Sequence, residues 1–528
     1  MAILAKLQER HPAPATALSI ENLVPPAGSP PFQLSLDPNE FNLAKVLLAL
    51  PKGSAPGLDG WRFEFLRLVA ASASCCFSLL IVVNLMLQGG IPDDAVPPLA
   101  NCRLIPLKKG DNDVRPIAIA SCLRRLVARV VCYRSSRAFQ AFFQPIQFGV
   151  AVAGGTEAII HYARAHLQKN PDHCLIQVDI KNAFNEISRQ AFFAVLLSAF
   201  PGLFPFVKLF YGIEGGLFID DIVSIASREG VQQGDPLGPF LFCLGIQAIL
   251  ADLTVSHPEC KILAYMDDIS ILGPPAAALR VFHDLQTGCV PVGLRVNPDK
   301  CVIFSRTQNL VGLDVGSTPV VDMESSCIKV LGVPLGEDAA CGQWLLDRTN
   351  QIIATSKCLE NLVSLQHRWL LFKCCISQSF TFFLRTCPRQ VLFSGAGDDC
   401  KPALVWRNSL LDWLQKAAQS DVWTPGSVEQ VFLPAAFGGL GFIDPIQAAD
   451  AAFYGSWCLV GSLLQKFDPG LVTHSLEAAG NGPLRDVFSA FQRLKDEIRL
   501  DLLSPSDELP SPQSVIESPI LFAQARAM

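Results

Sequence analysis

The chain has 528 residues, of which 50% are hydrophobic, and it carries a formal net charge of −6 at pH 7. This length exceeds what one small domain needs, so we expect roughly two to four subdomains with substantial cores. The acidic balance excludes the overall positive charge of many nucleic-acid-binding proteins, so any such binding must come from a local basic surface.

The cysteines and histidines give no sign of a metal site. The eighteen cysteines occur singly or as the adjacent pairs Cys75-Cys76 and Cys374-Cys375, without a CxxC motif, and the eight histidines form no HExxH motif. Zinc binding and thioredoxin-like chemistry are therefore unsupported. No targeting signal is recognisable, so we expect an intracellular protein of the cytoplasm and/or nucleus with reduced, buried thiols.

The N-terminal part combines an irregular lead-in with helices and a strand. Residues 1–40 are rich in proline and predict a loosely ordered segment. Residues 36–50 predict a helix, which a cluster of turn residues ends. Residues 70–87 are apolar and just long enough to span a membrane, but serines and an asparagine dilute them. They therefore favour a core helix over a membrane span, and residues 102–109 predict a strand.

The middle of the chain alternates strands with apolar helices. Residues 173–180 form an almost continuous apolar run, which is typical of a central strand. A helix is predicted to follow from its N-cap Ser188. A second, longer apolar helix is predicted after Gly234, with Asp235 as its cap and Pro236 in its first position.

The C-terminal part is predicted to be mainly helical beyond Gly336, with a break at residues 437–442 and a frayed tail of about 30 residues. Strands and helices are interspersed along the chain without a regular βαβ alternation. This pattern predicts the α+β fold class, with a palm-like core flanked by helical parts.

Three aspartates could carry chemistry at the edge of a sheet. Asp179 follows the predicted central strand, and Asp267 and Asp268 stand at the turn of a hairpin predicted over residues 262–273. Taken singly, each is explained about as well by a cap or a turn. If the two strands are neighbours, the carboxylates converge and raise one another's pKa unless a cation lies between them. Oxygen ligands without His or Cys favour Mg²⁺, and a pair of such ions serves phosphoryl or nucleotidyl transfer.

Three motifs carry a resemblance to a known family. "YMDD" (265–268) resembles the Tyr-x-Asp-Asp box of reverse transcriptases, "VDIKNAFNEISR" (178–189) their first carboxylate motif, and "GVQQGDPLGPFLF" (230–242) their glycine-rich motif. Their order and spacing are highly specific and point to the non-LTR (LINE-like) retrotransposon branch. Similar segments extend the resemblance over about residues 45–460, namely "SAPGLDGWRFEFL", "LIPLKKGDNDVRPIAIAS", "GLRVNPDKCVIF", "IKVLGVPLG", "LRTCP" and "LPAAFGGLGF".

This resemblance implies a right-hand polymerase with fingers, a palm built on an antiparallel sheet, and a helical thumb. The implied parts are a partly disordered N-terminal lead-in, fingers with part of the palm, the palm with the catalytic motifs, a mostly helical thumb, and a C-terminal extension with a disordered tail. Their residues are 1–44, 45–172, 173–320, 321–425 and 426–528, in that order.

The resemblance also implies two Mg²⁺ ions, for which Mn²⁺ can substitute. Asp179 and Asp267 would be their principal ligands, assisted by the backbone carbonyl of Ile180, with Asp268 as a weaker ligand near the primer end. One ion would lower the pKa of the primer 3′-hydroxyl and the other would hold the triphosphate. Lys300 matches a lysine that protonates the departing pyrophosphate, although a plain surface lysine explains it almost as well.

A local basic stretch matches the fingers residues that grip the triphosphate. Arg115 with either Lys108 or Lys109 fits this role, and the choice stays open because Leu107 stands where relatives often carry the lysine. The stretch is the expected phosphate-facing surface of an otherwise acidic chain. Nine basic residues stand there against two acidic ones: Arg103, Lys108, Lys109, Arg115, Arg124, Arg125, Arg129, Arg134 and Arg137 against Asp111 and Asp113.

Four further residues complete the nucleotide site that the resemblance implies. Phe184 matches a bulky side chain that excludes a 2′-hydroxyl and so favours deoxynucleotides. Without the motif, the sequence context of Phe184 favours a plain core residue. Gln233, Gly234 and Tyr265 lie where contacts to the incoming nucleotide are expected, and Gly234 would permit close backbone approach.

The implied partners are an RNA template, a DNA or RNA primer and dNTPs, with no membrane. Related elements carry an endonuclease, which another chain or a missing segment would have to supply. Two alternatives stay open: an inactive truncated or domesticated copy that at most binds RNA, and an RNA-dependent RNA polymerase. Tyr265-Met266 disfavours the latter, in which a glycine usually precedes the two aspartates, and the intact aspartates argue against decay.

Overall fold

The computed structural model describes residues 2–14, 17–20, 39–110, 113–219, 223–419, 423–470 and 484–497, with the single residues 23, 34, 36 and 37. Its contacts divide the chain into two compact units. Unit 1 comprises Met1–Val152, Val178–Ile271 and Arg280–Lys300, and unit 2 comprises Ala153–Gln177, Leu272–Leu279 and Cys301–Met528. The predicted C-terminal tail lies outside the described residues.

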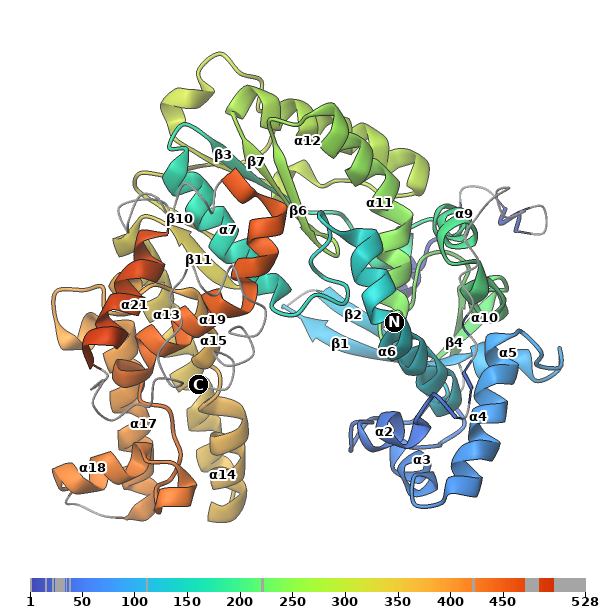
Figure 1. Cartoon of the computed structure of the whole chain (residues 1–528), viewed down its shortest axis with the longest axis horizontal. Coiled ribbons are helices and arrows are strands. Elements are labelled where there is room, and N and C mark those ends of the chain that lie inside the picture. The colour runs from blue at the N-terminus through green and yellow to red at the C-terminus, as the bar shows by residue number, and fades with distance from the viewer. Residues whose placement is uncertain are drawn as a thin grey trace. The chain divides into compact units, whose positions relative to one another are not determined.

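Unit 1 contains short N-terminal helices, a four-stranded sheet and two long helices (Figure 1). The elements that lie wholly or for the most part in unit 1 are α1 (Ala2–Glu9), α2 (Leu43–Leu48), α3 (Phe63–Val69), α4 (Ala73–Leu87), α5 (Val96–Ala100), β1 (Cys102–Lys109), β2 (Asp113–Ile119), α6 (Cys122–Phe143), α8 (Ala183–Glu186), α9 (Arg189–Ala199), α10 (Phe204–Tyr211), β4 (Gly215–Ile219), β5 (Val223–Ser227), α11 (Gly238–Ser256), β6 (Lys261–Tyr265), β7 (Asp268–Gly273) and α12 (Pro275–Cys289).

The four-stranded sheet of unit 1 has the order β2-β1-β4-β5. Its outer pairs are antiparallel, whereas β1 and β4 run parallel. Helix α1 covers one face, where the fully buried Leu7 shares a core with Leu104 and Ala118. Arg10, just after α1, forms an ion pair with Asp113 of β2 at 2.7 Å. The predicted loosely ordered lead-in therefore begins with a helix that completes the core of this sheet.

A buried ion pair ties α6 to the segment before α11. Arg124 donates to Asp235 at 2.8 Å, and the exposed fractions of the two side chains are only 1% and 5%. The same carboxylate accepts a hydrogen bond from the Tyr211 hydroxyl at 2.8 Å, and its other oxygen accepts from the backbone N–H of Leu237 at 2.9 Å. The prediction that Asp235 caps this helix, with Pro236 in its first position, is therefore wrong: α11 begins at Gly238 with Leu237 as its N-cap, and Asp235 instead bonds the backbone just before the helix. A buried charge is stable only with such complete pairing.

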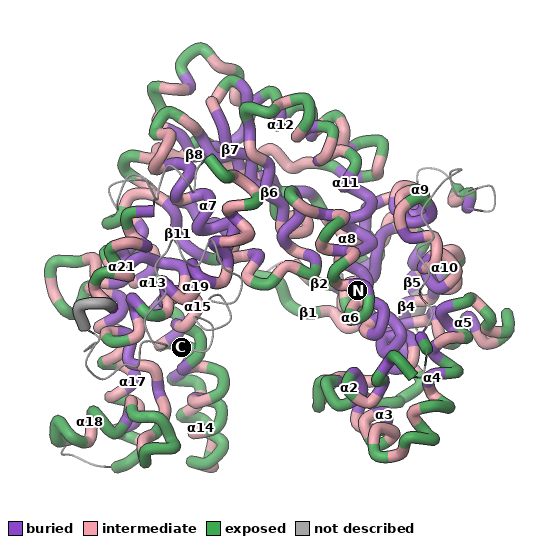
Figure 2. Tube along the Cα trace, viewed as in Figure 1, coloured by how far each residue is buried: buried purple, intermediate pink, exposed green. Residues whose placement is uncertain are grey.

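Two predicted helices of unit 1 form with small differences. Helix α9 begins after Ser188 as predicted, but the Glu229 side chain, and not Ser188, accepts from the backbone N–H of Arg189. Among the described helices, α11 alone has the length and hydropathy to cross a membrane. Most of its length is buried inside the protein (Figure 2), which is also the state of a soluble core helix.

The apolar stretch predicted as a core helix is only partly buried. It forms α4, whose buried residues include Leu80 and Val83. Phe77, Ile81 and Leu85 are instead exposed, by 51%, 55% and 42% of their surface. The prediction of a core helix is therefore wrong for this face, because α4 is apolar on all sides and the described residues cover only one of them.

A five-stranded sheet carries the order β6-β7-β3-β8-β9, with β3 at Cys174–Val178, β8 at Val302–Ser305 and β9 at Val320–Asp322. The strands β3 and β8 are antiparallel, and β8 and β9 are parallel. The sheet is thus mixed at this edge rather than fully antiparallel as predicted. Because β7 is the neighbour of β3, the condition for convergence of the predicted carboxylates is met.

Unit 2 is mainly helical beyond Gly336, as predicted. Helix α19 packs on α7, α15, α17 and α21, and its Asp450 accepts from both Arg389 and Arg493. The further elements of this unit are α7 (Gly155–Lys169), β10 (Cys327–Val330), β11 (Val333–Gly336), α13 (Asp338–Lys357), α14 (Leu365–Leu371), α15 (Thr381–Thr386), α16 (Arg389–Leu392), α17 (Pro402–Ala418), α18 (Pro425–Phe432), α19 (Pro445–Phe467) and α21 (Arg485–Glu497).

The α+β class is confirmed by these elements, as are the strands predicted at residues 102–109 and 173–180. The helix predicted over residues 36–50 is shorter and begins at Leu43. All cysteines are free, as predicted, but Cys75, Cys374 and several others are exposed rather than buried.

Replacing Arg124 by methionine should destabilise unit 1 by about 3–5 kcal/mol, because the carboxylate of Asp235 loses its charged partner while still buried. Urea unfolding followed by circular dichroism measures this loss. The matched control is Arg134→Met, an exposed arginine of the same helix, which should stay within about 0.5 kcal/mol of the wild type. An Arg124→Met protein as stable as the wild type would contradict the structural role assigned to this pair.

Candidate active site

Asp179 lies at the exposed end of β3, where a second segment pairs with the backbone. The carbonyl of Asp179 accepts from the N–H of Asn297 at 2.8 Å, and Ile180 forms an antiparallel bridge with Val296. The segment then turns through the short helix Pro298–Lys300, so the exposed Lys300 stands three positions beyond the residue bonded to Asp179. The predicted Asp179, Ile180 and Lys300 therefore belong to one local arrangement.

The hairpin turn between β6 and β7 consists of Met266 and Asp267. Met266 has a left-handed backbone, with φ of 58°, which is uncommon for a residue with a side chain. Asp267 is half-buried, and Tyr265 ends β6 and is also half-buried. Asp268 is exposed and is the first residue of β7, so only one of the two predicted aspartates occupies the turn itself.

The carboxylates interact electrostatically, as the pKa of Asp267 shows. Burial, then the negative charge of Asp268 and, more weakly, that of Asp179 raise this pKa to about 6, while Lys109 opposes the rise. Asp267 thus senses two other carboxylates and one ammonium group. A cation placed among these oxygens would remove the repulsion that raises the pKa.

The oxygen ligands of these aspartates fit a Mg²⁺ site that waters and phosphates complete better than they fit a metal site closed by protein ligands alone. The described residues contain no group of three or more His, Cys, Asp or Glu side chains arranged to hold a metal ion. Mg²⁺ is commonly held by one or two carboxylates, with waters and substrate phosphates completing the octahedron. Asp179 and Asp267 could provide such a pair, with Asp268 adjacent, so the residues present fit a magnesium ion that a phosphate ligand helps to hold.

The register of β1 and β2 distinguishes the two candidate lysines. Leu107 lies opposite Arg115, and Lys109 lies opposite Asp113, so these four side chains share one face. Lys108 belongs to the opposite face, on which Val114 packs toward the core under α1. Lys109 also lowers the pKa of Asp267. The geometry therefore groups Lys109 with Arg115 beside the carboxylates and leaves Lys108 on the other face.

Phe184 lies between the carboxylate loop and the glycine-rich loop. Its ring stacks on Phe242 of α11, with centroids 4.8 Å apart and planes inclined by 9°, and is only half-buried. Its carbonyl accepts from the N–H of Val231 at 2.7 Å, which joins the two loops. The contact with Phe242 supports the plain core reading of Phe184, while its incomplete burial leaves part of the residue exposed.

The loop with Gln233 and Gly234 adjoins the end of β2. The carbonyl of Gln233 accepts from the N–H of Ala118 at 2.7 Å. Gly234 has φ of 119°, and a Cβ on it would lie 2.5 Å from the carbonyl oxygen of Ala118. The close approach expected at this glycine is therefore an approach to the protein's own strand. Both residues lie at the same loop as predicted, with Gln233 half-buried and Gly234 exposed.

The predicted basic surface is smaller than the sequence suggested. Arg124 and Arg125 are buried, and their exposed fractions are 1% and 6%. Arg125 donates to the carbonyl of Ala55 at 2.9 Å and to Ser54 at 3.1 Å. Assigning these two arginines to a phosphate-facing surface is therefore wrong, because they hold unit 1 together.

Two contributors near the site were not predicted. Gln147 is buried and bonds through its side chain to the backbone of Met266. Arg10 accepts at its carbonyl from the side chain of Asn182, three residues after Asp179. The available signals were a glutamine within an otherwise apolar stretch, and the helical spacing of Leu4 and Leu7 in the lead-in.

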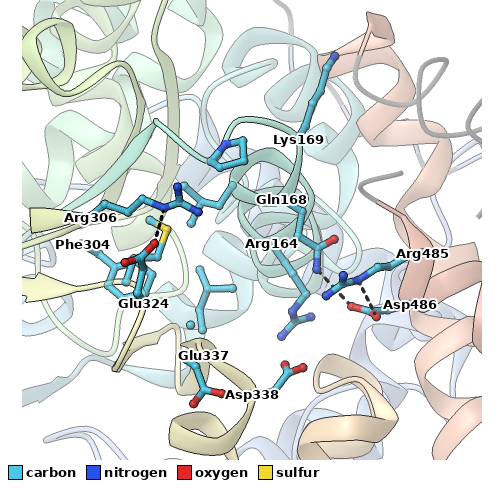
Figure 3. Close-up of a pocket in the computed structure, with 15 residues that line it drawn as sticks. Arg164, Gln168, Lys169, Phe304, Arg306, Glu324, Glu337, Asp338, Arg485 and Asp486 are labelled. Carbon is cyan, nitrogen blue, oxygen red and sulfur yellow. Dashed lines mark hydrogen bonds and ion pairs between the residues drawn. The ribbon is translucent and has the colours of Figure 1, made fainter. Parts of the chain in front are cut away.

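A separate cavity of about 720 Å³ lies within unit 2 and is lined by none of the predicted site residues. Four of its charged side chains form two ion pairs (Figure 3): Arg306 contacts Glu324 at 3.2 Å, and Arg485 contacts Asp486 at 3.7 Å. Burial and the neighbouring Asp486 raise the pKa of Asp338. The lining of the cavity contains four basic and four acidic residues, so it is not dominated by charge of one sign.

Comparisons with known proteins agree with the sequence motifs. Residues 107–335 match the family model described as "Reverse transcriptase (RNA-dependent DNA polymerase)". The chain is 29% identical over 286 residues to the retrotransposable element SLACS 132 kDa protein of Trypanosoma brucei gambiense, which covers 52% of this chain and 24% of that protein. It is 28% identical over 270 residues to the Pol polyprotein from the type-2 retrotransposable element R2DM of Drosophila melanogaster. This alignment covers 47% of this chain and 24% of that protein.

The matches span about a quarter of the length of these two curated relatives. Among solved structures, an apo telomerase from Candida tropicalis, truncated from its C-terminal domain, matches with a TM-score of 0.32 and 13% identity. That match covers 46% of this chain and 54% of the other. The fold class rests on the strands and helices of the chain itself.

Replacing Asp267 by asparagine should stabilise the metal-free protein. Above pH 6 the folded state carries the cost of an ionised, half-buried carboxylate next to two like charges, and the amide removes that cost. The difference between a pKa of about 6 and the ordinary 3.8 corresponds to at most about 3 kcal/mol, and about 1–2 kcal/mol after allowance for solvent. Thermal unfolding in EDTA at pH 8 should therefore show a higher Tm for Asp267→Asn.

The pH dependence gives the sign of this effect. The gain should shrink as the pH falls from about 6 toward 3.8 and vanish below, because the carboxyl is then neutral in both the folded and unfolded states. Adding Mg²⁺ should raise the Tm of the wild type but not that of Asp267→Asn. The control is Asp252→Asn on the exposed side of α11, which should change neither result. A lower Tm for Asp267→Asn in EDTA would refute the repulsion.

Proposed function

We propose that this chain, whose residues 107–335 form a reverse transcriptase domain related to the proteins of SLACS and R2 elements, is an RNA-directed DNA polymerase. The observation that carries the proposal is the mutual interaction of Asp179, Asp267 and Asp268 with Lys109 beside them, although 88 positions separate the first two aspartates. This arrangement offers oxygen ligands to a cation and a positive charge to a phosphate. The substrates would be dNTPs on an RNA template with a DNA or RNA primer.

The metal would be held by the side chains of Asp179 and Asp267 with the carbonyl of Ile180, and Asp268 would lie close to the primer end. When bound, two Mg²⁺ ions supply the charge that activates a primer 3′-hydroxyl and stabilises a leaving pyrophosphate, and Mn²⁺ is the expected substitute. Without such positive charge the carboxylates repel, and this repulsion adds to burial in raising the pKa of Asp267.

The chain's own cations would act on the triphosphate. Lys109 and Arg115 share one exposed face of the β1–β2 hairpin and would bind phosphate oxygens from that side. Lys108, on the other face, is the weaker candidate. Lys300 is exposed, three residues after Asn297, whose N–H is bonded to the carbonyl of Asp179. It would donate a proton to the departing pyrophosphate.

The uncharged residues would select and hold the nucleotide. Phe184 would present its exposed part beneath the sugar, where a ring leaves no space for a 2′-hydroxyl. Gln233, Gly234 and Tyr265 would line the base and sugar from the neighbouring loop and the end of β6. In the proposed polymerase, residues 45–172 act as fingers, 173–320 as palm, 321–425 as thumb and 426–528 as a C-terminal extension.

Replacing Asp179 by alanine should lower primer extension by at least about a thousandfold, since a lost metal ligand costs several kcal/mol of transition-state stabilisation. The assay is extension of oligo(dT) on poly(rA) with Mg²⁺, comparing dTTP with UTP. Circular dichroism should show an unchanged fold, because the side chain is exposed. Asp172→Ala, an exposed aspartate just before β3, is the matched control and should extend primers normally.

The wild-type result in this assay separates the alternatives. Incorporation of dTTP supports the proposal, incorporation of UTP alone would indicate an RNA polymerase, and incorporation of neither would indicate an inactive RNA-binding copy. Retained extension by Asp179→Ala would overturn the assignment of the ligand.

Replacing Phe184 by valine should raise the ratio of kcat/KM for UTP over dTTP by about 10- to 100-fold, because the smaller side chain leaves space for the 2′-hydroxyl. Steady-state extension with each nucleotide measures the ratio. Phe142→Val, at another half-buried phenylalanine of unit 1, is the control and should leave the ratio unchanged. An unchanged ratio with normal dTTP use would leave Phe184 as a core ring stacked on Phe242.

A further inference from the structure

A short segment after α6 extends the sheet beyond β6. The N–H of Ala264 donates to the carbonyl of Ile146 at 2.9 Å, and the N–H of Phe148 donates to the carbonyl of Ala264 at 2.7 Å. Gln147 therefore stands in parallel register with Ala264, two residues before the hairpin turn. The segment of residues 146–149, here called the turn support, belongs to unit 1 together with the turn.

Gln147 binds both polar groups of one turn residue. Its side chain is buried, with 1% exposed. The side-chain oxygen accepts from the N–H of Met266 at 2.7 Å, and the side-chain nitrogen donates to the carbonyl of Met266 at 3.2 Å. A neutral amide alone offers one donor and one acceptor at this spacing, whereas a carboxylate would lose the donor and add a negative charge.

Gly149 shows how closely the support fits the turn. A Cβ at this position would lie 2.8 Å from both the backbone nitrogen and the Cγ of Met266. The support therefore contacts the turn through backbone on one side and through the Gln147 amide on the other. Gly149 blocks movement of Met266 toward the support, and the hydrogen bonds from the Gln147 side chain oppose movement away from it.

The residue so held is the one with an uncommon backbone. Met266 has φ of 58°, a conformation that side chains with a Cβ rarely adopt. It is followed directly by Asp267, whose neighbours include the like charges of Asp179 and Asp268. A change of Met266 to a right-handed conformation would turn the next peptide and redirect the Asp267 carboxylate.

We propose that Gln147 is a positioning residue, which holds Met266 in its left-handed conformation and so keeps the Asp267 carboxylate directed at the metal and nucleotide site. The inference rests on the proposed function, since it assigns to Asp267 the role of a metal ligand. It goes beyond that function by assigning the geometry of the ligand to a side chain 120 positions earlier in the chain.

The test uses the full chain with Gln147→Met, which keeps the volume of the side chain and removes both hydrogen bonds. Binding of Mn²⁺ without substrate is measured by electron paramagnetic resonance, and kcat and the KM for the primer–template are measured by primer extension with dTTP. Loss of a residue that orients a metal ligand typically costs about 10- to 100-fold in metal affinity or activity. We expect a fall of this size in Mn²⁺ affinity and in kcat, with little change in the KM for the primer–template.

A second substitution distinguishes positioning from general support of the fold. Glycine adopts a positive φ without steric cost, so adding Met266→Gly to Gln147→Met should restore at least about a third of the Mn²⁺ affinity and kcat of Met266→Gly alone. A loss of structure elsewhere would not be restored by this change. The matched control is Gln140→Ala in α6, a partly buried glutamine outside the turn support, which should bind Mn²⁺ as the wild type does.

The outcomes separate this inference from the proposed function. Wild-type Mn²⁺ affinity and kcat in Gln147→Met would overturn the inference, as would a double variant that fails to fold, because Gln147 would then hold the fold rather than the turn. If Gln147→Met alone fails to fold, the test is the comparison of Mn²⁺ affinity and kcat between the double variant and Met266→Gly. A wild type that binds Mn²⁺ in a Gln147-dependent way but extends no primer would refute only the proposed function.

Discussion

The repulsion between carboxylates at the end of the five-stranded sheet is the constraint on which the rest of the site depends. Asp267 is half-buried beside two like charges, so its ionised form is disfavoured unless positive charge lies nearby. Folding must keep these groups together against that force. It does so with neighbouring strands, a paired segment beside Asp179 and a turn whose backbone is bonded on both sides. The site is therefore maintained by hydrogen bonds to the backbone, one pair of them from the neutral side chain of Gln147, and these do not involve the charged groups of the aspartates.

Much of this arrangement could be predicted from the sequence. The apolar run before Asp179 and the two β-forming runs around Met266 indicated strands, because strand patterns depend on near neighbours in the chain. The motifs around Asp179 and around Asp267 predicted that these aspartates lie close together, and the strand order agrees because β7 is the neighbour of β3. The α+β class followed from the same irregular alternation of elements.

What could not be predicted depends on distant partners. Arg124 and Arg125 look like phosphate ligands in a basic stretch, yet Asp235 and Ala55, far away in the chain, hold them inside the protein. The choice between Lys108 and Lys109 required the register of β1 on β2, which a single sequence does not contain. Helix α4 appeared fit for a core, but its second apolar face lacks a covering element among the described residues. The glycine at position 234 was explained by a nearby ligand, whereas the carbonyl of Ala118, close to it in space, already leaves no room for a side chain there.

The position of α1 has a consequence for how the chain acquires its structure during synthesis. Leu7 is buried against strands that include Ile225, so the first turns of the protein share a core with a strand made more than 200 residues later. Contacts of such long separation are closed late and at a high entropic cost. Before β4 and β5 leave the ribosome, α1 can pack only on the β1 and β2 side of this core. Its surroundings are thus complete only when the whole four-stranded sheet has been made.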